Sequence, residues 1–127
     1  MTILLVEDSK MLRIASSRAL VRAGYQVITA VDGEEALRMA QESPPDLILL
    51  DMLLPKITGL DVLRRLKSDG RTKDIPVIVL SGLSQANEAK LVTEGATAFL
   101  EKSERMTAND SADLVEAVKS VLAKASK

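Results

Sequence analysis

The stretch Asp46–Pro55, DLILLDMLLP, places an acidic side chain inside an almost wholly apolar segment. Four apolar residues, 47–50, run directly into Asp51, and three more follow it before the proline. Burying a carboxylate without a compensating partner costs several kcal/mol. The segment therefore predicts a buried strand that ends at a carboxylate whose charge is compensated.

Two further apolar runs resemble this one, and two weaker candidates complete a set of five. The strong runs are Ile3–Val6, Leu47–Leu50 and Val77–Leu80, and the weaker ones are Gln26–Ala30 and Thr97–Leu100. Short aliphatic or β-branched runs bounded by polar or turn residues are typical of strands covered on both faces.

Between these runs, apolar residues recur with helical spacing. They are Met11, Leu12, Ala15, Ala19 and Leu20; Ala36, Leu37 and Ala40; Leu60, Leu63 and Leu66; Ala89 and Val92; and Leu114, Val115, Val118 and Leu122. Strand and helix thus alternate along the chain. This alternation predicts the α/β class, with a parallel sheet and helices on both of its faces.

Composition excludes several classes of function. The 127 residues suffice for one domain, and we expect that domain to span 1–127, either as a natural chain or as a piece cut from a longer protein. The chain has no cysteine and no histidine, which removes thiolate catalysis, the usual zinc sites and the commonest general base. A net charge of −1 gives no indication of direct nucleic-acid binding.

The N-terminus lacks the pattern of a signal peptide, because acidic residues follow the first apolar run at once. No apolar stretch approaches the roughly 20 residues needed to cross a bilayer. We therefore expect a cytoplasmic protein without membrane insertion.

Polar residues follow the predicted strands at the point where each ends. Glu7 and Asp8 follow the first, Asp51 the third, Ser81 the fourth, and Lys102 comes shortly after the fifth. The ligand crevice of an open parallel sheet lies outside the carboxyl ends of its strands, so these residues can converge there. Taken singly, each has a simpler interpretation: Glu7-Asp8 or Asp51 as a helix cap, Ser81 as a turn residue, Lys102 as a solvated cation.

Convergence of Glu7, Asp8 and Asp51 predicts a cation site. Each like-charge pair about 4 Å apart costs roughly 4 kcal/mol at an effective dielectric of about 20. Oxygen ligands select a hard ion, and Mg²⁺ suits an open crevice better than Ca²⁺. With Lys102 and the Ser81 hydroxyl beside it, the site resembles an aspartyl-phosphate site in which Asp51 is the nucleophile.

These motifs resemble the receiver domain of bacterial two-component response regulators, of which the chemotaxis regulator CheY is the stand-alone type. The resemblance runs through ILLVEDS (3–9), DLILLDMLLPKITG (46–59), PVIVLSG (76–82) and AFLEKS (98–103). It implies a flavodoxin-like, doubly wound fold with five parallel strands in the order 2-1-3-4-5.

Residue by residue, the resemblance makes Asp51 the phosphoacceptor. It places Asp8 on Mg²⁺ directly, Glu7 on it through water, and Leu53 on it through the backbone carbonyl. The family implies phosphorylation by a sensor histidine kinase or a phosphotransfer protein, and a downstream protein target that the sequence does not identify. It implies a signalling switch that catalyses only its own phosphorylation and dephosphorylation.

The same resemblance assigns the switching residues. Ser81 matches the family's Thr or Ser, Lys102 its lysine, and Phe99 the aromatic residue that swings inward on phosphorylation. Phosphorylation would then shift the population of one arrangement of the face formed by the fourth helix, fifth strand and fifth helix.

Two departures from the family pattern concern the segment after the fifth strand. Ser103 follows Lys102 where the family usually has a proline in a cis peptide. The segment SERMTANDS (103–111) is longer than usual, so we expect the last helix to start between Thr107 and Ser111.

Leu53 and Leu83 bear on the lifetime of the phosphorylated state. Both flank the site in sequence, and both are apolar and unable to orient an attacking water. The sequence therefore predicts slow loss of the phosphoryl group.

Three alternatives remain at this stage. A Mg²⁺-dependent phosphohydrolase of the haloacid dehalogenase type would need an aspartate where Leu53 stands. A pseudo-receiver that only binds partners would have no need of buried like charges. A flavin-binding protein of the same fold would need a phosphate-cradling loop rich in Gly, Ser or Thr after the first strand.

Overall fold

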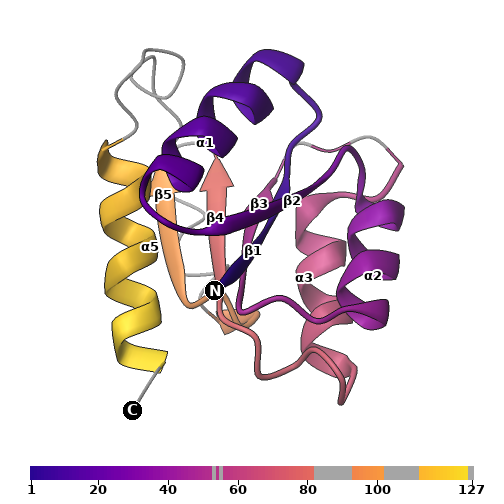
Figure 1. The fold of residues 1–127 in the computed structure, drawn as a ribbon. Helices are drawn as coiled ribbons and strands as arrows, with labels where there is room; N and C mark the ends of the chain where they lie inside the picture. Colours follow the sequence, from indigo (N-terminus) through magenta and orange to yellow (C-terminus); the bar gives the residue numbers. More distant parts are fainter. Residues whose placement is uncertain (53, 55, 82–92, 102–111, 126–127) are drawn as a thin grey trace.

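The computed structural model describes residues 1–52, 54, 56–81, 93–101 and 112–125. One parallel sheet forms its centre (Figure 1). The strands are β1 (Thr2–Val6), β2 (Gln26–Ala30), β3 (Leu47–Asp51), β4 (Val77–Ser81) and β5 (Ala98–Glu101), in the spatial order β2-β1-β3-β4-β5. The predicted fold class and strand order are confirmed.

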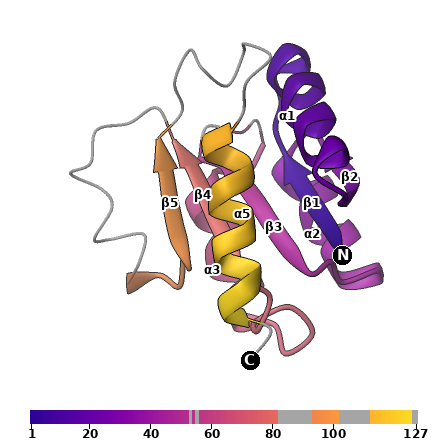
Figure 2. The same cartoon turned by 60° about the vertical axis from the view of Figure 1, so that its left-hand side comes forward.

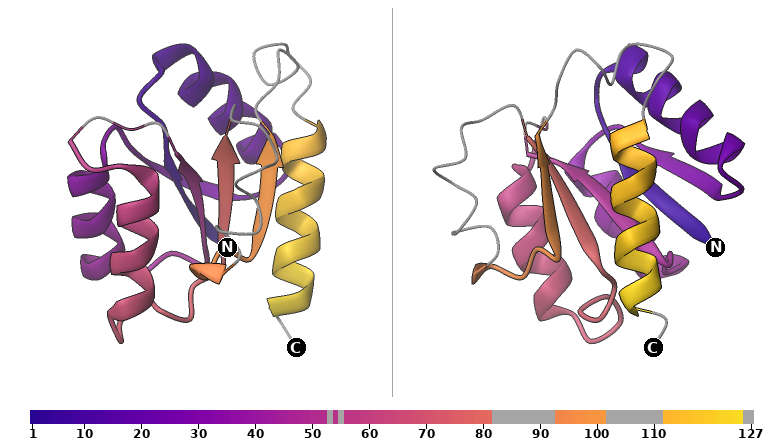
Figure 3. Two further views of the ribbon diagram at one scale, coloured as in Figure 1. Left: turned by 180° about the vertical axis from the view of Figure 1, so that it is seen from behind. Right: turned by 90° about the vertical axis from the view of Figure 1, so that its left-hand side faces the viewer.

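Helices cover both faces of the sheet (Figures 2 and 3). The described helices are α1 (Lys10–Arg22), α2 (Gly33–Glu42), α3 (Gly59–Ser68) and α5 (Ala112–Ala125). Helices α1 and α5 lie on one face, and α2 and α3 lie on the other. The helix expected around Ala89 and Val92, and the expected start of the last helix between 107 and 111, fall outside the described residues.

The alternation of strand side chains divides the core into two layers. In β3, Ile48 and Leu50 pack towards α2 and α3, whereas Leu47 and Leu49 pack towards α1 and α5. All four side chains are fully buried, so β3 is apolar on both faces, as its continuous apolar run predicts. Only at the strand end does a polar side chain, Asp51, enter this pattern.

Short polar side chains start three of the helices. Ser9, Asp32 and Thr58 are the N-caps of α1, α2 and α3, and each side-chain oxygen accepts a hydrogen bond from the backbone N–H three residues later. The interpretation of Glu7-Asp8 as the cap of the first helix is therefore wrong. Ser9 fills that role, and the two acidic residues precede the helix.

The last strand is shifted by one residue from its predicted position. β5 runs from Ala98 to Glu101 rather than from Thr97 to Leu100. Thr97 instead closes the entry to the strand, because its hydroxyl accepts a hydrogen bond from the Val77 backbone N–H at 3.2 Å and its own N–H donates to the Val77 carbonyl at 2.8 Å. Because threonine has high strand propensity, propensity alone does not tell whether β5 starts at Thr97 or at Ala98.

The Asp32 cap gives a pH-dependent prediction. The hydrogen bond from the Glu35 N–H lowers the pKa of the Asp32 carboxyl below its usual 3.8. The positive charge of Lys56 also lowers this pKa, by a smaller amount. A lowered carboxyl pKa adds stability above the pKa of the unfolded chain, and that stability is lost as pH falls through the folded pKa. In Asp32→Asn, which retains a capping oxygen, this contribution is absent.

We therefore expect the parent chain to have the higher unfolding temperature at pH 6 to 7 and to lose that advantage progressively below 3.8. Thermal unfolding of both chains across this range is the measurement. A difference in unfolding temperature that stays constant with pH would contradict the expectation.

Candidate functional site

The register of the sheet brings Glu7 and Asp51 together. Val6 pairs with Leu50, so the residues that follow them occupy the next position on two neighbouring strands. Pairing continues past both strand ends: the Glu7 N–H donates to the Ala30 carbonyl at 3.0 Å, and the Met52 N–H donates to the Leu80 carbonyl at 3.0 Å. The backbone on both sides of the site is therefore fixed by the sheet itself.

Three carboxylates meet at this edge of the sheet. Oxygen atoms of Glu7, Asp8 and Asp51 all lie within 4.8 Å of one another. Glu7 is 2% exposed and Asp51 is 1% exposed, whereas Asp8 faces solvent. Two buried carboxylates and one at the rim form an oxygen-only set that is open on one side, which fits a hard divalent cation that keeps part of its water shell.

The start of α1 supports the acidic loop. The Ser9 backbone N–H donates to Glu7 Oε2 at 3.1 Å. Arg13 Nη1 donates to the backbone carbonyls of Glu7 at 3.1 Å and of Asp8 at 3.4 Å. The positive end of the α1 dipole also lies beside the acidic residues that precede the helix.

Neither Ser9 nor Arg13 was among the predicted site residues. A signal for Arg13 does exist in the sequence. The first turn of α1 carries no acidic residue, although acids are favoured at that end of a helix. Basic residues in this first turn indicate that the negative charge they balance lies in the loop before the helix.

Lys56 ties two neighbouring loops together at the same edge of the sheet. Its Nζ lies 3.6 Å from Asp32 Oδ2 and 3.9 Å from Glu34 Oε2. It also has a φ of 69°, a left-handed backbone conformation that is uncommon for a residue other than glycine. The loop that follows β3 is thereby held against the start of α2.

The remaining predicted site residues are placed only in part. Ser81 is the last residue of β4, at the same edge of the sheet, but its side chain is outside the described part of the structure. Phe99 is half-buried and packs against the core layer beneath α2 and α3. Leu53, Leu83, Lys102 and Ser103 lie outside the described residues, so their predicted roles stay predictions.

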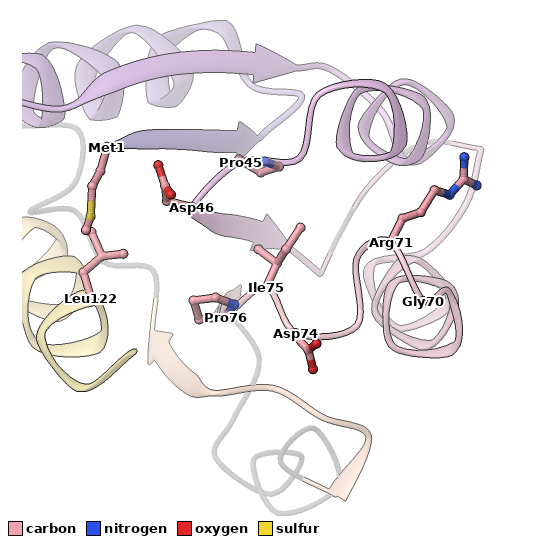
Figure 4. A pocket seen from close by; sticks show the side chains of 9 residues that line it. All are labelled: Met1, Pro45, Asp46, Gly70, Arg71, Asp74, Ile75, Pro76 and Leu122. Atoms are coloured by element: carbon pink, nitrogen blue, oxygen red, sulfur yellow. The ribbon is translucent and has the colours of Figure 1, made fainter. Parts of the chain in front are cut away.

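A pocket of about 390 Å³ opens at the opposite end of the sheet (Figure 4). Asp46 and Pro76, which precede β3 and β4, line it together with Met1 and Leu122. Asp46 Oδ2 accepts a hydrogen bond from the Thr2 backbone N–H at 2.7 Å, which gives this carboxylate a structural role. The pocket is therefore separate from the acidic cluster at the carboxyl ends of the strands.

Comparison with known proteins identifies the class of this fold and site. The family model described as "Response regulator receiver domain" matches residues 3–119. The chain belongs to this family. It is a phosphorylation-dependent signalling domain of two-component systems and not an enzyme of the ordinary kind.

Solved structures agree with this assignment. The chain resembles the chemotaxis protein CheY4 of Vibrio cholerae with a TM-score of 0.83 and 30% identity, covering 94% of this chain and 97% of that one. It resembles the receiver domain of the Francisella response regulator 1452 with a TM-score of 0.86 and 26% identity, covering 99% and 98%.

Curated relatives differ in how much of their length the chain matches. It is 37% identical over 103 residues to the polar-differentiation response regulator DivK of Brucella anthropi, covering 80% of this chain and 83% of DivK. It is 43% identical over 86 residues to the DNA-binding dual master transcriptional regulator RpaA of Synechocystis, covering 68% of this chain. The matched region spans only 36% of RpaA.

The helices in the described ranges include none that combines the length and the apolar character needed to span a membrane.

Proposed function

We propose that Asp51 is the phosphoacceptor of this receiver domain and that the whole span 1–127 acts as a single receiver unit. The observation that supports this role is the burial of Asp51, at 1% exposure, within reach of two further carboxylates at the end of the central strand. Folding alone does not favour three acidic side chains at one place, so the arrangement supports a cation site that includes Asp51.

The proposed reaction is a direct phosphoryl transfer. A carboxylate oxygen of Asp51 attacks the phosphorus of a phosphohistidine on a sensor kinase or phosphotransfer protein. The O–P bond forms as the P–N bond breaks, and the electron pair remains on the ring nitrogen, which takes a proton from solvent. When the signal is switched off, water attacks the phosphorus. The electron pair of the O–P bond returns to Asp51 and inorganic phosphate leaves.

Glu7, Asp8 and Asp51 are the residues that would hold Mg²⁺, joined by the backbone carbonyl of Leu53. When bound, the ion neutralises charge on the phosphoryl oxygens during transfer. The residues of the chain keep the geometry: the sheet register fixes Glu7 and Asp51, and Ser9 and Arg13 hold the loop that carries Asp8.

Three further roles follow from the family pattern. Lys102 would contact the bound phosphoryl group as a second positive charge, and Ser81 would donate a hydrogen bond to it. Phe99 would then change its packing, and the altered surface would be read by a downstream protein that the comparisons do not identify. The half-buried position of Phe99 supports this role, because a partly exposed residue alters the surface when its packing changes.

Intact mass spectrometry tests the proposal. The chain is incubated with acetyl phosphate and Mg²⁺, with a parallel sample in EDTA. We expect a gain of one phosphoryl group that requires Mg²⁺, located at Asp51 by borohydride trapping of the acyl phosphate and peptide mapping. No gain in the folded chain, with a kinase also tried, would favour the pseudo-receiver instead, and sustained turnover of p-nitrophenyl phosphate would favour the phosphohydrolase.

Loss of the phosphoryl group is expected to be slow. Leu53 and Leu83 offer no polar group to position the attacking water, so the phosphorylated chain in Mg²⁺ should persist for minutes or longer. The decay of phosphorylated mass after removal of acetyl phosphate measures this lifetime. A half-life of seconds without a phosphatase would show that another group orients the water.

A further inference from the structure

An ion pair joins helix α3 to the segment 94–97, which leads directly into β5. Arg64 Nε donates to Glu94 Oε2 at 3.0 Å, and Arg64 Nη2 donates to Glu94 Oε1 at 3.1 Å. The guanidinium thus binds both oxygens of one carboxylate, a geometry that fixes the relative orientation of the two side chains. Asp61, one turn earlier in α3, also lies 3.9 Å from Arg64 Nη1.

Lys67, one turn further along α3, makes a second contact with the same segment. Its Nζ donates to the backbone carbonyls of Lys73 at 3.1 Å and of Ile75 at 2.8 Å, just before β4. Its aliphatic stem passes Gly95, where an added β-carbon would lie 2.8 Å from Lys67 Cγ. Gly95 also has a φ of 110°, which favours glycine. Lys67 therefore holds the entrances of both β4 and β5 against one helix.

The segment 94–97 in turn positions Phe99. Ala96 is 6% exposed and belongs to the core layer beneath α2 and α3. Thr97 exchanges two hydrogen bonds with Val77 at the entrance of β4. Phe99 follows two residues later and packs against the same core layer. A displacement of segment 94–97 would therefore also change the packing of Phe99.

The other end of α3 touches the backbone of the proposed phosphoacceptor. Gly59, the first residue of the helix, donates its N–H to the Met52 carbonyl at 3.1 Å, and its α-carbon lies against the backbone of Asp51 and Met52. The helix runs from this edge of the sheet towards the opposite edge, where segment 94–97 enters β5 (Figures 1 and 3). One helix of about 15 Å thus contacts both the end of β3 and the entrance of β5.

We propose that the Arg64–Glu94 ion pair and the Lys67 stem over Gly95, together called the α3 clamp, hold β5 in its resting arrangement, and that phosphorylation of Asp51 loosens this clamp through α3. The inference rests on the proposed function of Asp51. Phe99 is half-buried while the clamp is closed, so the closed clamp accompanies the arrangement from which this side chain would move inward. The clamp adds a second route from the site to the switching face, besides Ser81.

The exposure of the ion pair suits a contact that must open. The side chains of Arg64 and Glu94 are 48% and 28% exposed. A pair in contact with water contributes modestly, whereas a deeply buried pair is strongly destabilising to break. Coupling is reciprocal: if phosphorylation weakens the α3 clamp, then weakening the clamp by substitution must favour phosphorylation by the same factor.

Two readouts on the full chain test the proposal. The rate of labelling by acetyl phosphate and Mg²⁺, followed by intact mass, measures phosphorylation. The chain has one phenylalanine, Phe99, so 4-fluorophenylalanine gives a single ¹⁹F resonance that reports the surroundings of this residue alone. Neither readout responds to a loss of global stability in a chain that remains folded.

Three variants alter the ion pair, and one matched control leaves it intact. Arg64→Gln and Glu94→Gln each remove it, and the double variant Arg64→Glu/Glu94→Arg restores it with the charges exchanged. The control is Arg71→Gln, which removes an ion pair of the same geometry: Arg71 Nε donates to Asp69 Oδ1 at 3.2 Å and Nη2 donates to Oδ2 at 2.9 Å. That pair lies after α3 and within one loop.

We expect acetyl phosphate to label Arg64→Gln and Glu94→Gln about threefold faster than the parent chain. Before labelling, the Phe99 resonance of both variants should lie between the positions that it takes in the parent chain before and after phosphorylation. The charge exchange should return both readouts towards the parent values. Arg71→Gln should match the parent chain in both.

Other outcomes overturn the inference in distinguishable ways. Parent-like labelling and an unmoved Phe99 resonance in Glu94→Gln would show that the ion pair only stabilises the fold. Slower labelling would show that α3 supports the site itself rather than the resting arrangement of β5. The same changes in Arg71→Gln would assign them to loss of charge in general. Failure of acetyl phosphate to label the parent chain would contradict the proposed function of Asp51, and the α3 clamp with it.

Discussion

Replacing Asp51 with asparagine is expected to abolish phosphorylation and to raise the free energy of unfolding in metal-free buffer by about 2 kcal/mol. Asparagine has nearly the same shape but no carboxylate to attack phosphorus. It also removes one of three like charges whose oxygen atoms lie within 4.8 Å, two of them on buried side chains. Activity and stability should therefore change in opposite directions.

Mass spectrometry and urea unfolding of the same samples check both parts. Adding Mg²⁺ should stabilise the parent chain more than the variant, because a ligand stabilises the state that binds it. Asp74→Asn is the matched control, since Asp74 is exposed and lines the pocket at the opposite end of the sheet. It should keep phosphorylation and its Mg²⁺ dependence, and a stability gain there as large as at Asp51 would contradict the charge explanation.

Replacing Gly59 with alanine is expected to cost about 3 kcal/mol of stability and to slow phosphorylation about tenfold. Gly59 is the first residue of α3, and its N–H donates to the Met52 carbonyl at 3.1 Å. A β-carbon there would lie 2.6 Å from Met52 Cα and would also press on the carbonyl of Asp51. Neither of these backbone atoms can be displaced unless the end of β3 also moves.

Gly70→Ala separates this steric effect from the general effect of replacing a glycine. A β-carbon at Gly70 would meet nothing within 4 Å, so this variant should match or slightly exceed the stability of the parent chain. Chemical denaturation and the initial rate of labelling by acetyl phosphate are measured on both variants. If Gly59→Ala were destabilised but labelled at the parent rate, α3 would not position Asp51.

The sheet was predictable because its strands are buried on both faces. A continuous apolar run such as Leu47–Leu50 has few alternatives to an internal parallel strand, and each run ended where a polar residue interrupted it. Three strands extend one residue beyond their predicted runs, at Thr2, Asp51 and Ser81, and only β5, at the edge of the sheet, is shifted as a whole, because Thr97 precedes it despite its strand propensity. The ends of an edge strand are harder to predict, because burial does not determine where such a strand begins.

The acidic trio was predicted for a related reason. Residues at the carboxyl ends of parallel strands share one edge of the sheet however far apart they are in sequence, so the sequence alone groups Glu7, Asp8 and Asp51. The contacts around these three residues could not be predicted in this way. Arg13 binds backbone carbonyls and Gly59 meets the backbone of another element, and neither contact leaves a pattern of residue types at a fixed spacing.

The fold class, the edge at which the site lies and the residues that carry its charge follow from the sequence alone, because burial periodicity and strand polarity are local properties of the chain. Three features are visible only in the tertiary structure: Ser9 rather than Asp8 caps α1, Arg13 holds the acidic loop, and α3 begins against the end of β3. It also decided which apolar residues of α1 remain exposed. These features depend on how the helices pack against the sheet, and the spacing of residue types along the sequence does not specify that packing.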